Sequence, residues 1–126
     1  MRSELLPGVT APMAGHVAIH IHGSADRIQL AGKSEYLLGR ADPKNDAEPD
    51  VDLGLYNGQQ MGVSRRHATL LYNEFGLSIV DLGSTNGTLV NGRLLGAGKM
   101  QMLKDGDEVK LGKLAFNVYF NPENQK

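Results

Sequence analysis

Three short motifs in this 126-residue chain carry side chains that could together bind an anion. They are Gly39-Arg40, Ser64-Arg65-Arg66-His67 and Gly83-Ser84-Thr85-Asn86-Gly87-Thr88. They supply a guanidinium, a hydroxyl and a tight turn with an amide side chain. Arginine presents a planar fork of donors that matches phosphate oxygens, and a serine hydroxyl can donate one hydrogen bond. This set of groups would suit a phosphate attached to a peptide.

Short β-strands are expected to position these motifs, because alternating apolar residues recur along the chain while helical periodicity is not sustained. Val17, Ile19 and Ile21, for example, share one face of an expected strand. The 16 glycines and the intervening Asn-Gly and Asp-Gly pairs indicate many turns. The expected strands cover residues 16–22, 27–30, 35–39, 68–72, 77–80, 88–90, 100–103, 108–111 and 114–120. Many short, closely spaced strands predict an all-β antiparallel sandwich.

The ordered motifs, with Asp50-Val51-Asp52-Leu53 between the first two and Asn91-Gly92 after the third, resemble a forkhead-associated (FHA) domain. The resemblance extends from about His16 to Phe120. It implies an FHA/SMAD-like sandwich of two twisted sheets with binding loops at one end. It also implies a phosphothreonine-dependent peptide- or protein-binding module that acts as a signalling adaptor. The alternative is a phosphorylation-independent protein–protein scaffold on the same fold.

The resemblance assigns roles to individual residues of this chain. Arg40 and Ser64 would grip the phosphate, and Arg65 lies where the family places a further contact with the phosphate or peptide. Thr85 would shape the phosphate end of the site. Asn86 would hydrogen-bond the backbone of the bound peptide and so hold any phosphopeptide in register.

Other residues of the motifs are expected to support the site. Arg66 has two readings that stay open, a ligand contact at the rim or a solvated surface charge. Gly87 can adopt positive φ in the Thr85-Asn86-Gly87 turn. The residues expected to support the site structurally are Gly39, His67, Gly83 and Gly87.

Catalysis is not expected, although Ser64, His67 and Asp81 could suggest a nucleophilic triad. A Gly-x-Ser-x-Gly elbow would need glycine where this chain has Arg66. Two arginines beside the serine suit an anionic ligand better than a peptide carbonyl. In the family, the histidine supports the binding loop.

Composition excludes several other classes. The net charge of −1 and the low aromatic content do not match the basic, aromatic surface of a nucleic-acid-binding protein. The absence of cysteine excludes disulfides and zinc–thiolate sites. No apolar run approaches the roughly 20 residues of a membrane helix. His16, His20 and His22 share a strand face, but no carboxylate joins them at convincing spacing. We therefore expect no metal, no cofactor, no nucleic acid and no membrane partner.

The expected organisation is a flexible tail over residues 1–13, an FHA domain over 14–121 and a C-terminal tail over 122–126. The expected location is cytoplasmic. The expected partner is a phosphothreonine-containing protein, with an associated Ser/Thr kinase that makes the ligand. The oligomeric state is left open. Thr10, the only threonine of the tail, is a candidate regulatory phosphorylation site.

The loop after Arg40 carries acidic residues that the family pattern does not require. Asp50 falls on the family's common acidic position and is expected to be structural. Asp42, Asp46 and Glu48 would favour a basic residue beside the phosphothreonine by charge complementarity. The stretch Met61–Val63 carries no charge. We therefore expect the site to prefer an apolar ligand residue, or to have no preference, at the third position after the phosphothreonine.

Overall fold

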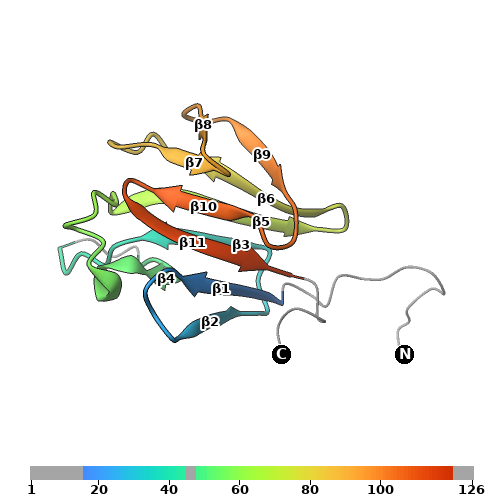
Figure 1. Ribbon diagram of the computed structural model, residues 1–126, viewed down its shortest axis with the longest axis horizontal. Coiled ribbons are helices and arrows are strands. Elements are labelled where there is room, and N and C mark those ends of the chain that lie inside the picture. The colour runs from blue at the N-terminus through green and yellow to red at the C-terminus, as the bar shows by residue number, and fades with distance from the viewer. Residues whose placement is uncertain (1–15, 45–47, 121–126) are drawn as a thin grey trace.

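The computed structural model describes residues 16–44 and 48–120, which form two stacked β-sheets (Figure 1). In these residues the larger sheet has six strands in the order β2-β1-β11-β10-β7-β8, and the smaller has five in the order β4-β3-β5-β6-β9. The strands are β1 (Val17–Ile21), β2 (Arg27–Leu30), β3 (Glu35–Gly39), β4 (Val51–Asp52), β5 (Arg66–Asn73), β6 (Gly76–Asp81), β7 (Thr88–Val90), β8 (Arg93–Leu95), β9 (Met100–Leu103), β10 (Glu108–Leu111) and β11 (Leu114–Tyr119). A short 3-10 helix, η1 (Leu53–Tyr56), follows β4.

Alternating side chains of the two sheets form one apolar core. Phe116 pairs with Val109 in the larger sheet, and both are fully buried. Leu70 and Ile79 are paired in the smaller sheet and are buried in the same cluster. Burying side chains of this size stabilises the fold by about 1.5–3 kcal/mol each.

The predicted all-β sandwich is confirmed, and several strand boundaries coincide with those expected. β5 extends beyond the expected 68–72, and β4 and β8 were not predicted. The two-residue β4 is too short to show alternation, and Arg93-Leu94-Leu95 in β8 has no polar–apolar alternation. The sandwich is also not antiparallel throughout, because β3 and β4 pair in parallel through Leu38↔Val51 and Gly39↔Asp52.

The chain polarity brings the three motifs to one end of the sandwich (Figure 1). β3 ends at Gly39 where β5 begins, and β6 ends where the loop to β7 begins. The β10–β11 turn lies at the same end because β7 and β10 are antiparallel. The loops there, referred to below as the loop end, include the described parts of the 40–50 loop (residues 40–44 and 48–50) and residues 53–65, 82–87 and 112–113.

The histidines near the N-terminal strand bond to different groups. His20 Nε2 lies 3.0 Å from the carbonyl oxygen of Ser24, whereas His22 Nε2 lies 2.6 Å from Asn117 Oδ1. Within residues 16–44 and 48–120, no three metal-ligating side chains are grouped closely enough to hold an ion.

No helix in the described residues is long and apolar enough to cross a membrane. The expected tails over residues 1–13 and 122–126, including Thr10, lie outside the described residues.

Gly39 occupies the tightest point between β3 and β5, and its replacement by alanine should destabilise the fold. The β3–β5 register shifts between Leu38 and Gly39, and a Cβ at position 39 would stand 1.9 Å from the carbonyl oxygen of Arg65. We expect Gly39→Ala to lower the free energy of unfolding by about 1–3 kcal/mol, measured by denaturant titration.

Ala41→Ser, at an exposed position two residues further on, is the surface control. It should change the free energy of unfolding by less than about 0.5 kcal/mol. Equal stability of Gly39→Ala and wild type would contradict this account of the β3–β5 contact.

Candidate functional site

The imidazole of His67 joins two of the three motifs. The backbone N–H of Ser64 donates to His67 Nδ1 at 3.0 Å, and His67 Nε2 lies 2.9 Å from the carbonyl oxygen of Gly87. Because Nδ1 accepts a hydrogen bond, the proton of the neutral ring belongs on Nε2, which donates to Gly87. The side chain is fully buried. The ring therefore fixes the Ser64 loop against the 82–87 loop.

Arg40 is held so that part of its guanidinium is already oriented. Its backbone N–H donates to the carbonyl oxygen of Arg65 at 3.0 Å, and its Nε donates to the carbonyl oxygen of Val63 at 2.7 Å. Arginine has five N–H donors, so the bond through Nε leaves the two terminal nitrogens with four. Val63 precedes Ser64, so these donors are anchored next to the serine. The carbonyl of Val63 is a backbone group, and no residue type in the sequence could have revealed its part.

The hydroxyl of Ser64 is oriented by the third motif. The backbone N–H of Thr85 donates to Ser64 Oγ at 3.1 Å. Within the described part of the chain, no acceptor takes the hydroxyl proton, so Ser64 retains one donor for a ligand. Thr85 itself is exposed. Ser64 and Thr85 are thus brought together, as the sequence predicts.

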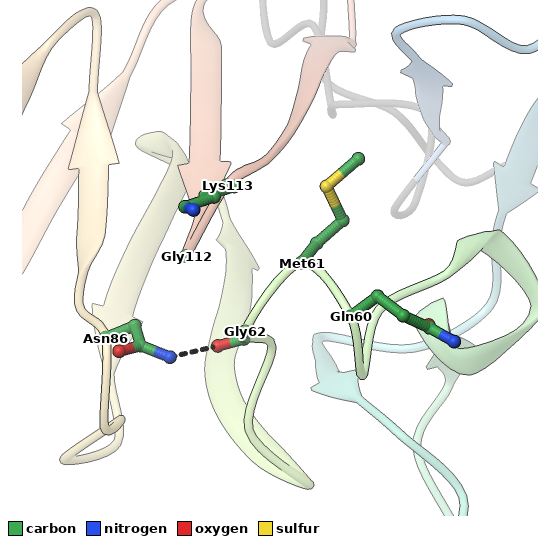
Figure 2. Close-up of a pocket in the computed structure, with 6 residues that line it drawn as sticks. All are labelled: Gln60, Met61, Gly62, Asn86, Gly112 and Lys113. Carbon is green, nitrogen blue, oxygen red and sulfur yellow. Dashed lines mark hydrogen bonds between the residues drawn. The ribbon is translucent and has the colours of Figure 1, made fainter.

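Asn86 lies on the other side of this contact and connects to the 53–65 loop. Its Nδ2 donates to the carbonyl oxygen of Gly62 at 2.9 Å, as Figure 2 shows. The second amide proton and Oδ1 remain available to a ligand. They could bond to a backbone C=O and a backbone N–H of a bound peptide. Gly62 has φ of +84°, and a Cβ there would stand 2.6 Å from Asn86 Nδ2 and displace this amide.

A pocket beside Asn86 extends the site towards the β10–β11 turn. Its volume is about 410 Å3, and Figure 2 shows Met61 and Lys113 along its wall. The Lys113 backbone N–H donates to the carbonyl oxygen of Met61 at 2.7 Å. Gly112 permits this contact, because a Cβ there would lie 2.6 Å from the same oxygen. Sequence analysis identified residues 112–113 only as a turn, and Lys113 adds a positive charge that the expectation for Met61–Val63 did not include.

Asp81 holds the 82–87 loop through hydrogen bonds to its carboxylate. Its carboxylate accepts from the backbone N–H groups of Gly83 and Ser84 and from the hydroxyls of Ser84 and Thr88, at 2.6–3.0 Å. Burial alone would raise the pKa of Asp81, but the donated hydrogen bonds lower it below its ordinary value. The Ser84 hydroxyl also accepts from the Gly87 N–H at 3.0 Å. Gly83 and Gly87 have φ of +82° and +87°, a conformation that glycine adopts without strain.

The two arginines after Ser64 differ in their surroundings. Arg65 Nη1 donates to Asp42 Oδ2 at 2.5 Å, in an ion pair across the 40–50 loop. Hydrogen bonds from the Lys44 amide and from Arg65 hold the pKa of Asp42 below its usual range. Arg66 is exposed at the start of β5. The pairing of Arg65 with Asp42 was not predicted, because it joins exposed loop residues that no periodicity connects.

The 40–50 loop is anchored by two other aspartates. Asp50 Oδ2 accepts from the Leu37 N–H at 2.7 Å and its other oxygen pairs with Lys33, which is the structural role expected of Asp50. Asp52 Oδ1 accepts from the N–H groups of Ala41 and Gly54 at 3.1 and 3.0 Å. Asp46 lies outside the described residues. Ala41, beside Arg40, and Asp50 are therefore both anchored to the sandwich.

The geometry does not form a nucleophilic triad. His67 Nδ1 accepts a hydrogen bond from the backbone N–H of Ser64 and not from its hydroxyl. The other ring nitrogen, Nε2, donates to the carbonyl oxygen of Gly87. Asp81 Oδ1 lies 4.0 Å from His67 Nε2. His67 and Asp81 instead hold the loops, and only the Ser64 hydroxyl keeps a proton that it can donate.

Stability should depend on pH through His67, because burial lowers the pKa of this imidazole below its usual value of about 6.5. The unfolded state then binds the proton more readily than the folded state. The free energy of unfolding should therefore fall as the pH is lowered through about 6.5. We expect denaturant titrations between pH 7.5 and 5.5 to show this loss, and His67→Gln to reduce the slope.

A direct check is the NMR titration of the His67 ring. An imidazole that titrates at or above the ordinary histidine value would contradict the buried, neutral state described above.

Comparison with known proteins agrees with this geometry. The family model for the FHA domain matches residues 36–112, a segment that contains all three motifs. The glycogen accumulation regulator GarA of Mycobacterium tuberculosis is 38% identical over 90 residues, which are 71% of this chain and 52% of that protein. The oxoglutarate dehydrogenase inhibitor of Corynebacterium glutamicum is 36% identical over 80 residues, which are 64% of this chain and 52% of that protein. The match thus spans about half the length of these relatives.

Solved structures give the same result. A chain from a structural and functional analysis of phosphothreonine-dependent FHA domain interactions has a TM-score of 0.67 and 29% identity. The match covers 85% of this chain and 98% of that chain. From the family match and the shared fold we conclude that this chain belongs to the family of FHA domains.

Proposed function

We propose that this chain binds phosphothreonine-containing peptides or proteins at the loop end and acts as an adaptor without catalysis of its own. The observation that carries the proposal is the anchored guanidinium of Arg40 beside the oriented hydroxyl of Ser64. Both groups are held by backbone atoms, so little side-chain entropy would be lost when a ligand arrives. The similarity to a domain studied for phosphothreonine-dependent interactions supports the same ligand class.

A phosphate is the anion that suits these donors best. A phosphothreonine carries about −1.5 to −2 charges at pH 7 and three acceptor oxygens. The terminal nitrogens of Arg40 can engage two of those oxygens, and the Ser64 hydroxyl can engage one. The net charge of the chain is −1, so the attraction must come from these local groups rather than from the overall field.

The surroundings of the phosphate site suit a peptide rather than a free anion. Asn86 offers an amide proton and an oxygen at the edge of the pocket formed with Met61, Gly112 and Lys113. An extended chain could bond its backbone to Asn86 and place a later side chain in that pocket. A Ser/Thr kinase would have to supply the phosphorylated partner.

Phosphate dependence is tested by titrating matched threonine and phosphothreonine peptides by calorimetry. We expect only the phosphorylated peptides to bind, and Arg40→Ala to weaken binding by about 2–5 kcal/mol, because one member of a desolvated charge pair is lost. Ser64→Ala should cost about 1.5–3 kcal/mol, the usual value of a hydrogen bond to a charged group.

Arg93→Gln is the matched control for charge. Arg93 is exposed on β8, at the opposite end of the β7–β8 hairpin from the 82–87 loop, and its loss should leave affinity unchanged. Equal binding of the two peptide forms would exclude phosphate dependence and favour a scaffold that ignores phosphorylation.

Asn86 should contribute affinity without selecting a sequence. Asn86→Ala removes hydrogen bonds to the ligand backbone and should weaken all phosphothreonine peptides by a similar factor, about 0.5–1.5 kcal/mol for each bond lost. A panel of peptides with different flanking residues, titrated against both proteins, gives the measurement. A loss confined to particular sequences would show that Asn86 reads side chains instead.

A further inference from the structure

The carboxylate of Asp42 forms an ion pair with Arg65, an arginine that lines the same pocket as Arg40. Asp42, Arg65 and Arg40 line one pocket of about 420 Å3 together with Ala41, Pro43 and Gln59. Asp42 Oδ2 accepts from Arg65 Nη1 at 2.5 Å. The Asp42 side chain is 15% exposed and that of Arg65 is 62% exposed, so solvent or a ligand reaches the arginine first.

The carboxylate of Asp42 is fixed independently of Arg65. Its other oxygen, Oδ1, accepts from the backbone N–H of Lys44 at 3.0 Å, which closes a local turn. If Arg65 rotated towards a phosphate, this turn would still hold the Asp42 carboxylate at the rim of the site. An ionised carboxylate left there without Arg65 would be hydrated by water or paired with a new cation.

The other carboxylates of the loop are less suited to contact a ligand. Asp50 is held by Lys33 and the Leu37 N–H, and Asp52 by the N–H groups of Ala41 and Gly54. Glu48 is exposed, and it does not line the pocket that contains Arg40. Among the described acidic residues of this loop, Asp42 alone is paired with a candidate ligand-binding side chain.

We propose that Asp42 is a specificity-determining residue that favours ligands with a basic side chain beside the phosphothreonine, through an exchange of ion pairs. This inference rests on the proposed phosphothreonine binding and adds a ligand class to it. In the free protein Arg65 pairs with Asp42. In the complex Arg65 pairs with the phosphate, and Asp42 pairs with the basic residue of the ligand.

The exchange keeps every charge paired for one class of ligand only. A peptide with neutral neighbours must break the Arg65–Asp42 pair and leaves the carboxylate with water. A peptide with an arginine or lysine in reach replaces the lost partner. An acidic neighbour would add repulsion to the same step.

The test is a titration of five proteins against phosphothreonine peptides that differ at one position. The reference peptide has alanine at the three positions on each side of the phosphothreonine, and each variant carries one arginine. The proteins are wild type, Asp42→Asn, Glu48→Gln, Arg65→Gln and the double variant Asp42→Asn/Arg65→Gln. Asn can still accept from the Lys44 N–H, so Asp42→Asn keeps the local turn while it removes the charge.

We expect wild type to bind one arginine peptide about three- to fivefold more tightly than the alanine peptide, the range of an exposed ion pair. In Asp42→Asn this ratio should fall to about one, chiefly because the alanine peptide binds more tightly once Arg65 is free of its internal partner. Glu48→Gln should keep the wild-type ratio. In Arg65→Gln the alanine peptide should gain nothing from the added Asp42→Asn change.

The outcomes separate this inference from the function on which it rests. If wild type binds phosphothreonine peptides without preferring any arginine variant, or if Asp42→Asn keeps the preference, the exchange is wrong and the binding function stands. If Asp42→Asn weakens all peptides equally, Asp42 only positions Arg65. If neither wild type nor Asp42→Asn binds a phosphopeptide, the proposed function fails and the inference fails with it.

Discussion

The buried ring of His67 is the interaction on which the loop end depends. One neutral imidazole accepts from the Ser64 N–H and donates to the Gly87 carbonyl, so it joins two loops that are distant in the chain. Both ring nitrogens are used, and water cannot replace either bond because the side chain is fully buried. The position of the Ser64 hydroxyl and that of the Thr85 amide therefore follow from the same ring.

The rest of the site is attached to this clamp through backbone groups. Arg40 reaches it through the carbonyl of Val63, and Asn86 through the carbonyl of Gly62. Asp81 fixes the 82–87 loop with four accepted hydrogen bonds. These polar groups hold the loops in place. The terminal nitrogens of Arg40 and the hydroxyl proton of Ser64 stay available to an external anion. This division of labour explains why a chain with a net charge of −1 can still present a local anion site.

The sequence predicts the sandwich and the positions of most motif residues for identifiable reasons. Strands such as Arg27–Leu30 and Glu108–Leu111 show in the sequence because buried and exposed residues alternate along them, and the ordered motifs mark the family. Asp50 was expected to be structural, and its bond to the Leu37 N–H agrees. β4 could not be predicted, because two residues are too few to show alternation. Its parallel pairing with β3 is a tertiary contact that the local sequence does not indicate. The parts played by the Val63 carbonyl and by the Asp42–Arg65 pair depend on loop geometry, which residue types do not encode.

The central claim is that a phosphate attached to a threonine binds between Arg40 and Ser64 at the loop end. The most direct measurement is an amide NMR titration of the labelled protein with a phosphothreonine peptide, compared with the same peptide unphosphorylated. The account predicts shifts centred on the amides of Ser64, Thr85 and Asn86, which depend on the phosphate and are lost in Arg40→Ala. Shifts that are the same for both peptides, or that centre on the outer faces of the sheets, would contradict it.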